Sequence, residues 1–202
     1  MKKLLVLISS LILIIMLFAV VASAATTYTV VKGDSMWKIA TRYEVGLSEI
    51  KSANPQISNP DLIYPGQVLN IPTTDSSVLS YEKEVVRLVN EIRVKNGLRS
   101  LEYDWQLSRV ARIKSQDMKD NRYFSHTSPT YGSPFQMMKS FGITYRSAGE
   151  NIAKGYKTPQ AVVDGWMNSP GHRANILNSS FTHIGVGYVE NGSYWTQMFI
   201  GK

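Results

Sequence analysis

Cysteine is absent from all 202 residues of the sequence. Its absence excludes a disulfide scaffold, a zinc site built from thiolates and a cysteine nucleophile. Histidine occurs only three times, at positions 126, 172 and 183, so any imidazole chemistry depends on these side chains. Internal repeats and low-complexity tracts are missing too. The 44% of hydrophobic and 18% of charged residues are typical of a globular protein.

Basic stretches interleaved with aromatic residues are also missing, although the net charge is +7. Such stretches mark nucleic-acid-binding surfaces, so we expect no nucleic-acid partner. The positive charge could attract anionic wall polymers or lipid head groups. It could equally do no more than keep the protein in solution.

The N-terminus has the pattern of a signal peptide over residues 1–24. Lysines precede an apolar run over residues 4–21, and a small-residue motif suited to signal peptidase ends at Ala24. The sequence therefore predicts an exported protein with a mature chain of residues 25–202. Because the apolar run of about 18 residues is just long enough to cross a bilayer, an uncleaved anchor is the alternative. Only in that case do we expect contact with a membrane.

A small polar segment divides the mature chain into two units. Residues 73–80 begin with Thr-Thr-Asp-Ser-Ser directly after Pro72, a composition typical of a linker. We therefore expect one unit over residues 25–72 and a second over residues 81–202. The excess of basic over acidic side chains lies in the second unit.

The first unit has the signals of a βααβ arrangement. Either Asp34 or Ser35 can cap a helix whose apolar residues recur at i, i+3, i+4 and i+7. The predicted elements are a strand over 28–31, a helix from Met36, a second helix over about 47–53 and a returning strand over 68–71.

Three stretches of this unit resemble a LysM module over residues 27–72. They are YTVVKGDSMWKIA from Tyr28, Ala-Asn-Pro from Ala53 and IYPGQVLNIP from Ile63. The resemblance implies binding of N-acetylglucosamine-containing glycans such as peptidoglycan or chitin, in a shallow groove between two loops whose backbone amides grip the acetamide groups. Carried over, the glycan-binding residues are Gly33, Asp34, Ser35, Met36, Asn54, Pro55, Gln56 and Ile57.

Trp37 has two interpretations in this unit. A tryptophan next to a helix start can pack in the core or stack on a sugar ring, and we expect core packing. The chain carries a single LysM copy, which predicts weak glycan binding because no second module adds avidity.

The second unit mixes helices and strands. Asp104 can cap a helix, and Thr158-Pro159 is a cap followed by a first-turn proline. The predicted elements are helices over about 81–95, 105–121, 134–141 and 159–166, a strand over 145–153, and strands over 181–189 and 194–200 joined by a hairpin turn at Asn191-Gly192.

His126, Glu150 and His172 are the candidate residues for chemistry. The two histidines lie in polar stretches that are predicted to be loops, and Glu150 follows a glycine inside a strand-like run. Their spacing in the chain is too wide for any local element to bring them together. From the residues alone, a shared site and three separately solvated side chains both remain open.

Five short motifs of this unit resemble, in order, those of a CAP domain. CAP domains form the superfamily of cysteine-rich secretory proteins, antigen 5 and pathogenesis-related 1 proteins, and this unit resembles its disulfide-free bacterial branch. They are SHTS from Ser125, GENIA from Gly149, VDGW from Val163, GHR from Gly171 and IGVGY from Ile184. The resemblance covers residues 81–202. It implies an α+β protein in which a small βααβ LysM module is joined to a three-layer α-β-α sandwich with a central cleft.

The cleft of this superfamily often carries two histidines and two glutamates. His126, Glu150 and His172 match three of them, and Ser169 stands where the second glutamate falls. The resemblance implies that His126 and His172 hold zinc or another divalent metal while Glu150 contacts a bound water. The same three residues are the catalytic candidates. A His-Glu-x-x-His motif is absent, so a metalloprotease mechanism lacks direct support.

Three functions therefore stay open for the second unit of a protein expected outside the cell, in the wall or spore envelope. The first is a binding module for a metal, a lipid-like ligand or a protein partner. The second is a metal-assisted hydrolase of wall or envelope material, with Glu150 as general base. The third is a structural protein of the spore coat or envelope. The missing fourth acid favours binding.

Overall fold

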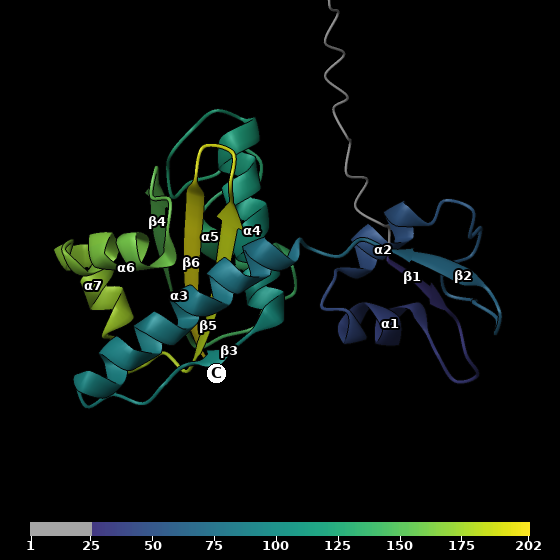
Figure 1. Cartoon of the computed structure of the whole chain (residues 1–202), viewed down its shortest axis with the longest axis horizontal. Coiled ribbons are helices and arrows are strands. Elements are labelled where there is room, and N and C mark those ends of the chain that lie inside the picture. The colour runs from purple at the N-terminus through teal and green to yellow at the C-terminus, as the bar shows by residue number, and fades with distance from the viewer. Residues whose placement is uncertain (1–25) are drawn as a thin grey trace, which may run out of the picture.

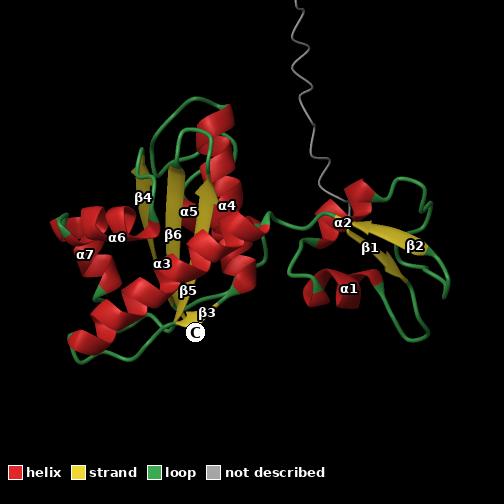
Figure 2. Cartoon of the chain, in the orientation of Figure 1, coloured by secondary structure: helices red, strands yellow, loops and turns green. Residues whose placement is uncertain are grey.

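Helices and strands are arranged in two separate units in the computed structural model, which describes residues 26–202 (Figure 1). The predicted signal peptide lies outside the described residues. Both units contain helices and strands, so the chain is an α+β protein (Figure 2). Among the described helices, none has the length and apolar character needed to cross a membrane.

The first unit has the predicted βααβ order. Ser35 rather than Asp34 caps the first helix, because its Oγ accepts the backbone N–H of Lys38 at 3.2 Å. The two strands pair antiparallel and pack with both helices around Ile39, Ile50 and Leu69. The elements are β1 (Thr26–Thr29), α1 (Met36–Arg42), α2 (Leu47–Ala53) and β2 (Val68–Ile71).

The second unit is built on a four-stranded sheet with the order β3-β5-β6-β4. Strand β3 pairs parallel to β5, and the other neighbours pair antiparallel, which leaves β4 at an edge. The elements are α3 (Ser76–Lys95), β3 (Glu102–Tyr103), α4 (Trp105–Asp120), α5 (Pro134–Ser140), β4 (Ser147–Lys154), α6 (Pro159–Met167), α7 (Pro170–Ile176), β5 (His183–Val189) and β6 (Tyr194–Gly201).

Helices cover both faces of this sheet, as the predicted three-layer sandwich requires (Figure 1). Helices α3, α6 and α7 pack on one face in a core that contains Trp166 and Phe199. Helices α4 and α5 pack on the other face in a core that contains Leu107, Met137 and Met198. The neighbours Met198 and Phe199 serve opposite cores because successive strand residues point to opposite faces.

Helix α3 is longer than the sequence-based expectation. It begins at Ser76, because Asp75 accepts the N–H of Ser77 at 2.7 Å, so the non-helical link between the units is 73–75 instead of 73–80. The hairpin turn between β5 and β6 is centred on Asn191-Gly192, as predicted. It closes through the N–H of Ser193, which donates to the carbonyl of Glu190 at 2.9 Å.

Two further elements were not predicted. Strand β3 is only two residues long and is too short to show a period. Helix α7 starts with Pro170 at its first turn, a helix-start signal that the following glycine obscured.

An ion pair connects the two units. Arg109 of α4 donates from Nε to Glu49 Oε1 at 2.7 Å and from Nη2 to Glu49 Oε2 at 2.8 Å. Gly46 lies against this pair, and a Cβ built there would lie 2.3 Å from Arg109 Nε. The absence of a side chain at Gly46 therefore lets α2 approach α4.

We predict that Glu49→Arg separates the two units. The substitution places two cations opposite each other, while both cores stay intact because the pair lies outside them. An exposed ion pair contributes only about 0.2–1 kcal/mol, so global unfolding changes little. Small-angle X-ray scattering should show a larger radius of gyration. The exchange Glu49→Arg/Arg109→Glu should restore the original value, and an unchanged radius in the single variant would contradict the prediction.

Candidate functional site

His126 and Glu150 meet at the edge of the sheet. Glu150 lies on the edge strand β4, and His126 lies in the loop that follows α4. His126 Nδ1 is 2.8 Å from Glu150 Oε1. The Glu150 side chain is 1% exposed and that of His126 is 52% exposed, so the carboxylate lies below the surface and the imidazole borders solvent.

Lys114 positions the backbone that carries His126. This lysine of α4 is fully buried, and its Nζ donates to the carbonyls of Ser125 at 2.8 Å and His126 at 3.0 Å, and to the Tyr123 hydroxyl at 3.0 Å. The sequence interpretation missed this role. The available signal was its place on the apolar stripe of α4, three residues after Ala111.

Asp117, one turn further along α4, holds the rest of the loop. Its carboxylate accepts hydrogen bonds from the hydroxyls of Ser128 at 2.7 Å and Thr130 at 2.8 Å, and from the Tyr123 hydroxyl. Burial alone would raise the pKa of Asp117, but these hydrogen bonds lower it overall, so the group stays a charged acceptor. Lys114 and Asp117 are thus positioning residues for His126.

His172 lies in helix α7, not in the loop expected from the sequence. The side-chain amide of Asn151 donates to the His172 carbonyl at 3.1 Å. Asn175 of α7 donates to Asn151 Oδ1 at 2.8 Å and to the Glu150 carbonyl at 3.2 Å. Because these bonds tie α7 to β4 at positions 150 and 151, the structure brings His172 to the same edge as His126 and Glu150.

The three side chains influence each other's protonation. Burial raises the pKa of Glu150, while the hydrogen bond from His126 and the charge of Lys114 oppose that rise. The Glu150 carboxylate raises the pKa of His126 through their hydrogen bond. Burial lowers the pKa of His172, and the charge of His126 lowers it further. We therefore treat these residues as one electrostatic cluster, called the edge cluster below.

One oxygen of this cluster lacks a partner. Glu150 Oε2 is buried and has no hydrogen bond to the residues that the structure describes. A buried polar atom without a partner costs about 1–3 kcal/mol, and such atoms occur where a ligand can supply the missing bond. Ser169 caps α7 through its backbone, and its side chain makes no capping bond there.

The protein donors fit a metal poorly. Across residues 26–202, no three side chains of His, Cys, Asp or Glu converge on a point that could hold an ion. Glu150 Oε1 is paired with His126, and Glu150 Oε2, although it has no partner, does not converge with the two imidazoles on such a point. Catalytic zinc sites usually have three protein ligands and structural sites four, so we derive no step through a metal.

Of the eight expected glycan-binding residues, Met36 is buried in the core of the first unit and Ile57 packs against that core. Asn54 is also buried, and its amide donates to the carbonyls of Ile50 and Asn70, both at 2.8 Å. These side chains shape the unit, and the expected grip on a sugar is by backbone amides. The residues that remain exposed are Gly33, Ser35, Pro55 and Gln56.

The first of these loops is held by Asp34. Its carboxylate accepts from the Tyr28 hydroxyl at 2.6 Å and from the Val31 N–H at 3.0 Å. Arg42 lies 3.4 Å from the other oxygen. The hydrogen bond from Tyr28, followed by that from Val31, lowers the pKa of Asp34. Asp34 therefore fixes the loop, while its side chain is largely covered.

Trp37 does not pack in the core, so that expectation was wrong. Its side chain is 62% exposed. Met36, Ile39 and Ala40 take the core-facing positions of α1, which leaves Trp37 on the outer face of the helix.

His183, the third histidine, lies on β5 and contacts Thr182 and Glu102, away from the edge cluster.

Comparisons with known proteins match both units. A family model described as "CAP: Cysteine-rich secretory protein family" matches residues 86–200, and a model described as "LysM domain" matches residues 28–72. The two resemblances seen in the sequence are thereby confirmed.

Individual relatives are bacterial. "Uncharacterized protein YkwD" of Bacillus subtilis is 70% identical over 127 residues, which are 63% of this chain and 49% of that protein. "SpoIVD-associated factor A" of the same organism is 52% identical over 46 residues, 23% of this chain and 12% of that protein. The chain spans about half the length of the curated relatives that it matches over long stretches.

A solved structure shares the fold. The crystal structure of an extracellular protein containing an SCP domain from Bacillus anthracis is 38% identical, with a TM-score of 0.60. The match covers 68% of this chain and 47% of that one.

We predict that His126 and His172 titrate separately in nitrogen-detected NMR. The pKa of His126 should lie above the ordinary histidine value, and the pKa of His172 should lie below it. Glu150→Gln should return the pKa of His126 toward about 6.5, the ordinary value. An unshifted His126 in the wild type would contradict the pairing.

The same pairing gives stability a pH dependence. A histidine with a raised folded-state pKa contributes stability that is present below its unfolded pKa and is lost as pH rises through the folded value. Glu150→Gln should therefore lower the free energy of unfolding more at pH 5.5 than at pH 8.5, as measured by urea denaturation.

Proposed function

Because the chain belongs to the cysteine-rich secretory protein family through residues 86–200 and carries a LysM domain at residues 28–72, we propose that it is a wall-associated binding protein. The LysM unit binds N-acetylglucosamine-containing glycan, such as peptidoglycan or a chitin-like polymer. The CAP unit presents the edge cluster to a second, polar ligand at that surface.

The observation that carries the CAP role is the unpartnered Glu150 Oε2. A ligand with an N–H or O–H group can donate to this oxygen. The half-exposed His126 next to it can then hydrogen-bond the same ligand. The hydrogen bonds from Lys114 hold the His126 backbone before the ligand arrives, so little ordering is required on binding.

The edge cluster contains a single acidic residue, Glu150, and this favours binding over hydrolysis. General acid–base catalysis needs a second group to complete proton transfer, and Ser169 stands at the position where a second glutamate would complete the set. Zinc or another divalent metal is the second candidate ligand. The Nδ1 contact to Glu150 would orient His126 for such a role, with His172 as the other donor.

We place the protein outside the cell, in the wall or spore envelope. The predicted signal peptide supports export. The names of the extracellular Bacillus anthracis protein and of SpoIVD-associated factor A describe those proteins, and they agree with this location. A membrane contact follows only if the leader stays attached.

We predict that Gln56→Trp weakens binding to purified peptidoglycan by about tenfold or more, roughly 1.4 kcal/mol. Gln56 is exposed in the second glycan loop, so a bulky side chain there blocks the loop. The substitution removes one hydrogen bond to Asn54 Oδ1, and Asn54 keeps its bonds to Ile50 and Asn70. Ser52→Trp, on the exposed face of α2, is the matched control.

Sedimentation of the full chain with peptidoglycan measures this effect. Equal binding by the Gln56 variant and the wild type would contradict the loop assignment. If binding disappears from all variants at high salt, the positive charge of the protein, rather than the loops, attaches it to the wall.

We predict that soluble peptidoglycan fragments shift the NMR signals of the His126 ring. Glu150→Gln should abolish the shift, because it replaces an acceptor with a donor, and should leave sedimentation with intact peptidoglycan unchanged. A parallel zinc titration tests the second candidate. Tight zinc binding that is lost in His126→Ala/His172→Ala would favour the metal, and no response to either probe would contradict a polar ligand of the wall.

A further inference from the structure

We propose that the groove between the two units is a second carbohydrate-binding site, which extends the glycan contact from the LysM unit onto the CAP unit. This inference rests on the proposed function. Its ligand is the same β-linked N-acetylglucosamine-containing strand, bound across more sugar residues than the two LysM loops can hold.

Both units contribute to this interdomain groove. It is a cavity of about 300 Å³ lined by α1 and α2 on one side and by α4 and the end of α5 on the other. That volume is at the lower end of ligand sites, which are roughly 300–1,000 Å³. The lining residues that carry the argument are Trp37, Ser48, Trp105, Gln106, Arg109 and Phe141.

Trp37 provides an aromatic face for a sugar ring. Trp166 and Trp195 are buried in the core, whereas Trp37 is 62% exposed and borders the groove. A large apolar side chain left in water is costly and marks a contact surface when other aromatic groups lie nearby. Trp105 and Phe141 line the same groove from the CAP side.

Polar groups complete a surface suited to a neutral, hydroxyl-rich ligand. Gln106 is exposed at the groove. Ser48 lines it from α2, and its Oγ donates to Glu49 at 2.8 Å and accepts from Arg109 at 3.2 Å. Arg109 already has partners, since its guanidinium pairs with Glu49 and lies 5.2 Å from the centre of the Phe141 ring. The carboxylate of Glu49 is thus neutralised. Aromatic faces with a few amide and hydroxyl groups bind uncharged ligands such as sugars.

The position of Trp37 gives the strand a continuous path. Trp37 directly follows residues 33–36, the first glycan loop of the LysM unit. Because Trp37 is exposed and lines the groove, it can contact a glycan that extends from this loop along α1. Trp105 and Gln106, at the start of α4, lie on the opposite side of the same groove.

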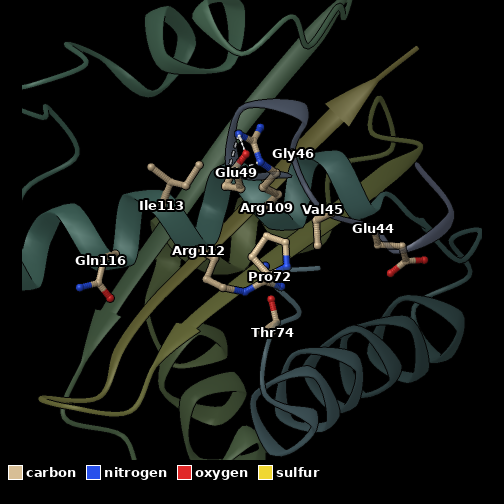
Figure 3. Close-up of a pocket in the computed structure, with 10 residues that line it drawn as sticks. All are labelled: Glu44, Val45, Gly46, Glu49, Pro72, Thr74, Arg109, Arg112, Ile113 and Gln116. Carbon is tan, nitrogen blue, oxygen red and sulfur yellow. Dashed lines mark hydrogen bonds and ion pairs between the residues drawn. The ribbon is translucent and has the colours of Figure 1, made fainter. Parts of the chain in front are cut away.

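Arg109 of the Glu49–Arg109 ion pair lines the groove. Figure 3 shows the two side chains pointing toward each other beside Gly46. Arg109 and Gly46 also line a second cavity, of about 250 Å³, which contains Pro72 and Arg112 and no aromatic residue. This second cavity lacks a surface for stacking, so we assign the sugar to the groove that holds Trp37.

Binding of chitin oligomers of two to eight sugars to the full mature chain tests the proposal, by calorimetry and tryptophan fluorescence. Trp166 and Trp195 are buried, so a change in emission reports on Trp37 and Trp105. We expect the wild type to bind the longest oligomers about tenfold more tightly than the short ones, with a blue shift in emission. Trp37→Ala and Gln106→Ala should lose this gain and keep the affinity for short oligomers.

Two further variants sharpen the result. Phe135→Ala removes an exposed aromatic side chain of α5 that does not line the groove, and it should behave as the wild type. Glu49→Arg should lose the length-dependent gain, because it separates the two sides of the groove.

The outcomes separate this proposal from the proposed function. If Trp37→Ala and Gln106→Ala bind long oligomers as the wild type does, while Gln56→Trp loses all binding, the groove is not a site and the LysM assignment stands. If the wild type binds neither chitin oligomers nor peptidoglycan, the proposed function fails and this inference fails with it.

Discussion

The close approach of α4 to strand β5 is the constraint on which the rest of the structure depends. A Cβ at Gly187 would lie 2.0 Å from the backbone nitrogen of Arg112, and one at Gly185 would lie 2.4 Å from the backbone of Leu107 and Ser108. Side chains at these positions would push the helix off the sheet. Polar bonds stabilise the contact, since Ser108 Oγ accepts the N–H of Val186 at 3.0 Å.

Helix α4 organises the site and the contact between the units because each of its faces has a different partner. One face packs on the sheet through Leu107 and Ala111. The side chains of Lys114 and Asp117 bind the loop that carries His126. Arg109 points toward Glu49 of the LysM unit. A shift of this single helix would therefore move both the edge cluster and the interdomain groove.

Buried charge is compensated by hydrogen bonds where it is structural. Glu82 is fully buried, but Arg112 donates to it twice, at 2.9 and 2.6 Å, and the N–H of Tyr188 donates at 2.9 Å. Glu150 differs, because one of its oxygens has no partner among residues 26–202. The contrast between these two glutamates supports a binding role for Glu150, since both carboxylate oxygens of Glu82 have hydrogen-bond partners.

Local features of the sequence determined both family assignments and the order of all described elements except β3 and α7. The caps at Asp104 and Thr158, the capping box at Ser133 and the apolar period of the helices each involve residues within one turn, so they can be recognised from neighbouring positions. The match of His126, Glu150 and His172 to the superfamily came from short motifs in the same way.

Only the tertiary structure decided which of these residues meet and which stay exposed. The hydrogen bond between His126 and Glu150 joins residues 24 positions apart in the sequence. Lys114, in helix α4, binds the backbone of the loop that follows this helix. The exposure of Trp37 and the buried role of Asn54 depend on what packs against them from other elements. These outcomes follow from the close packing of distant segments, which no local period or cap encodes.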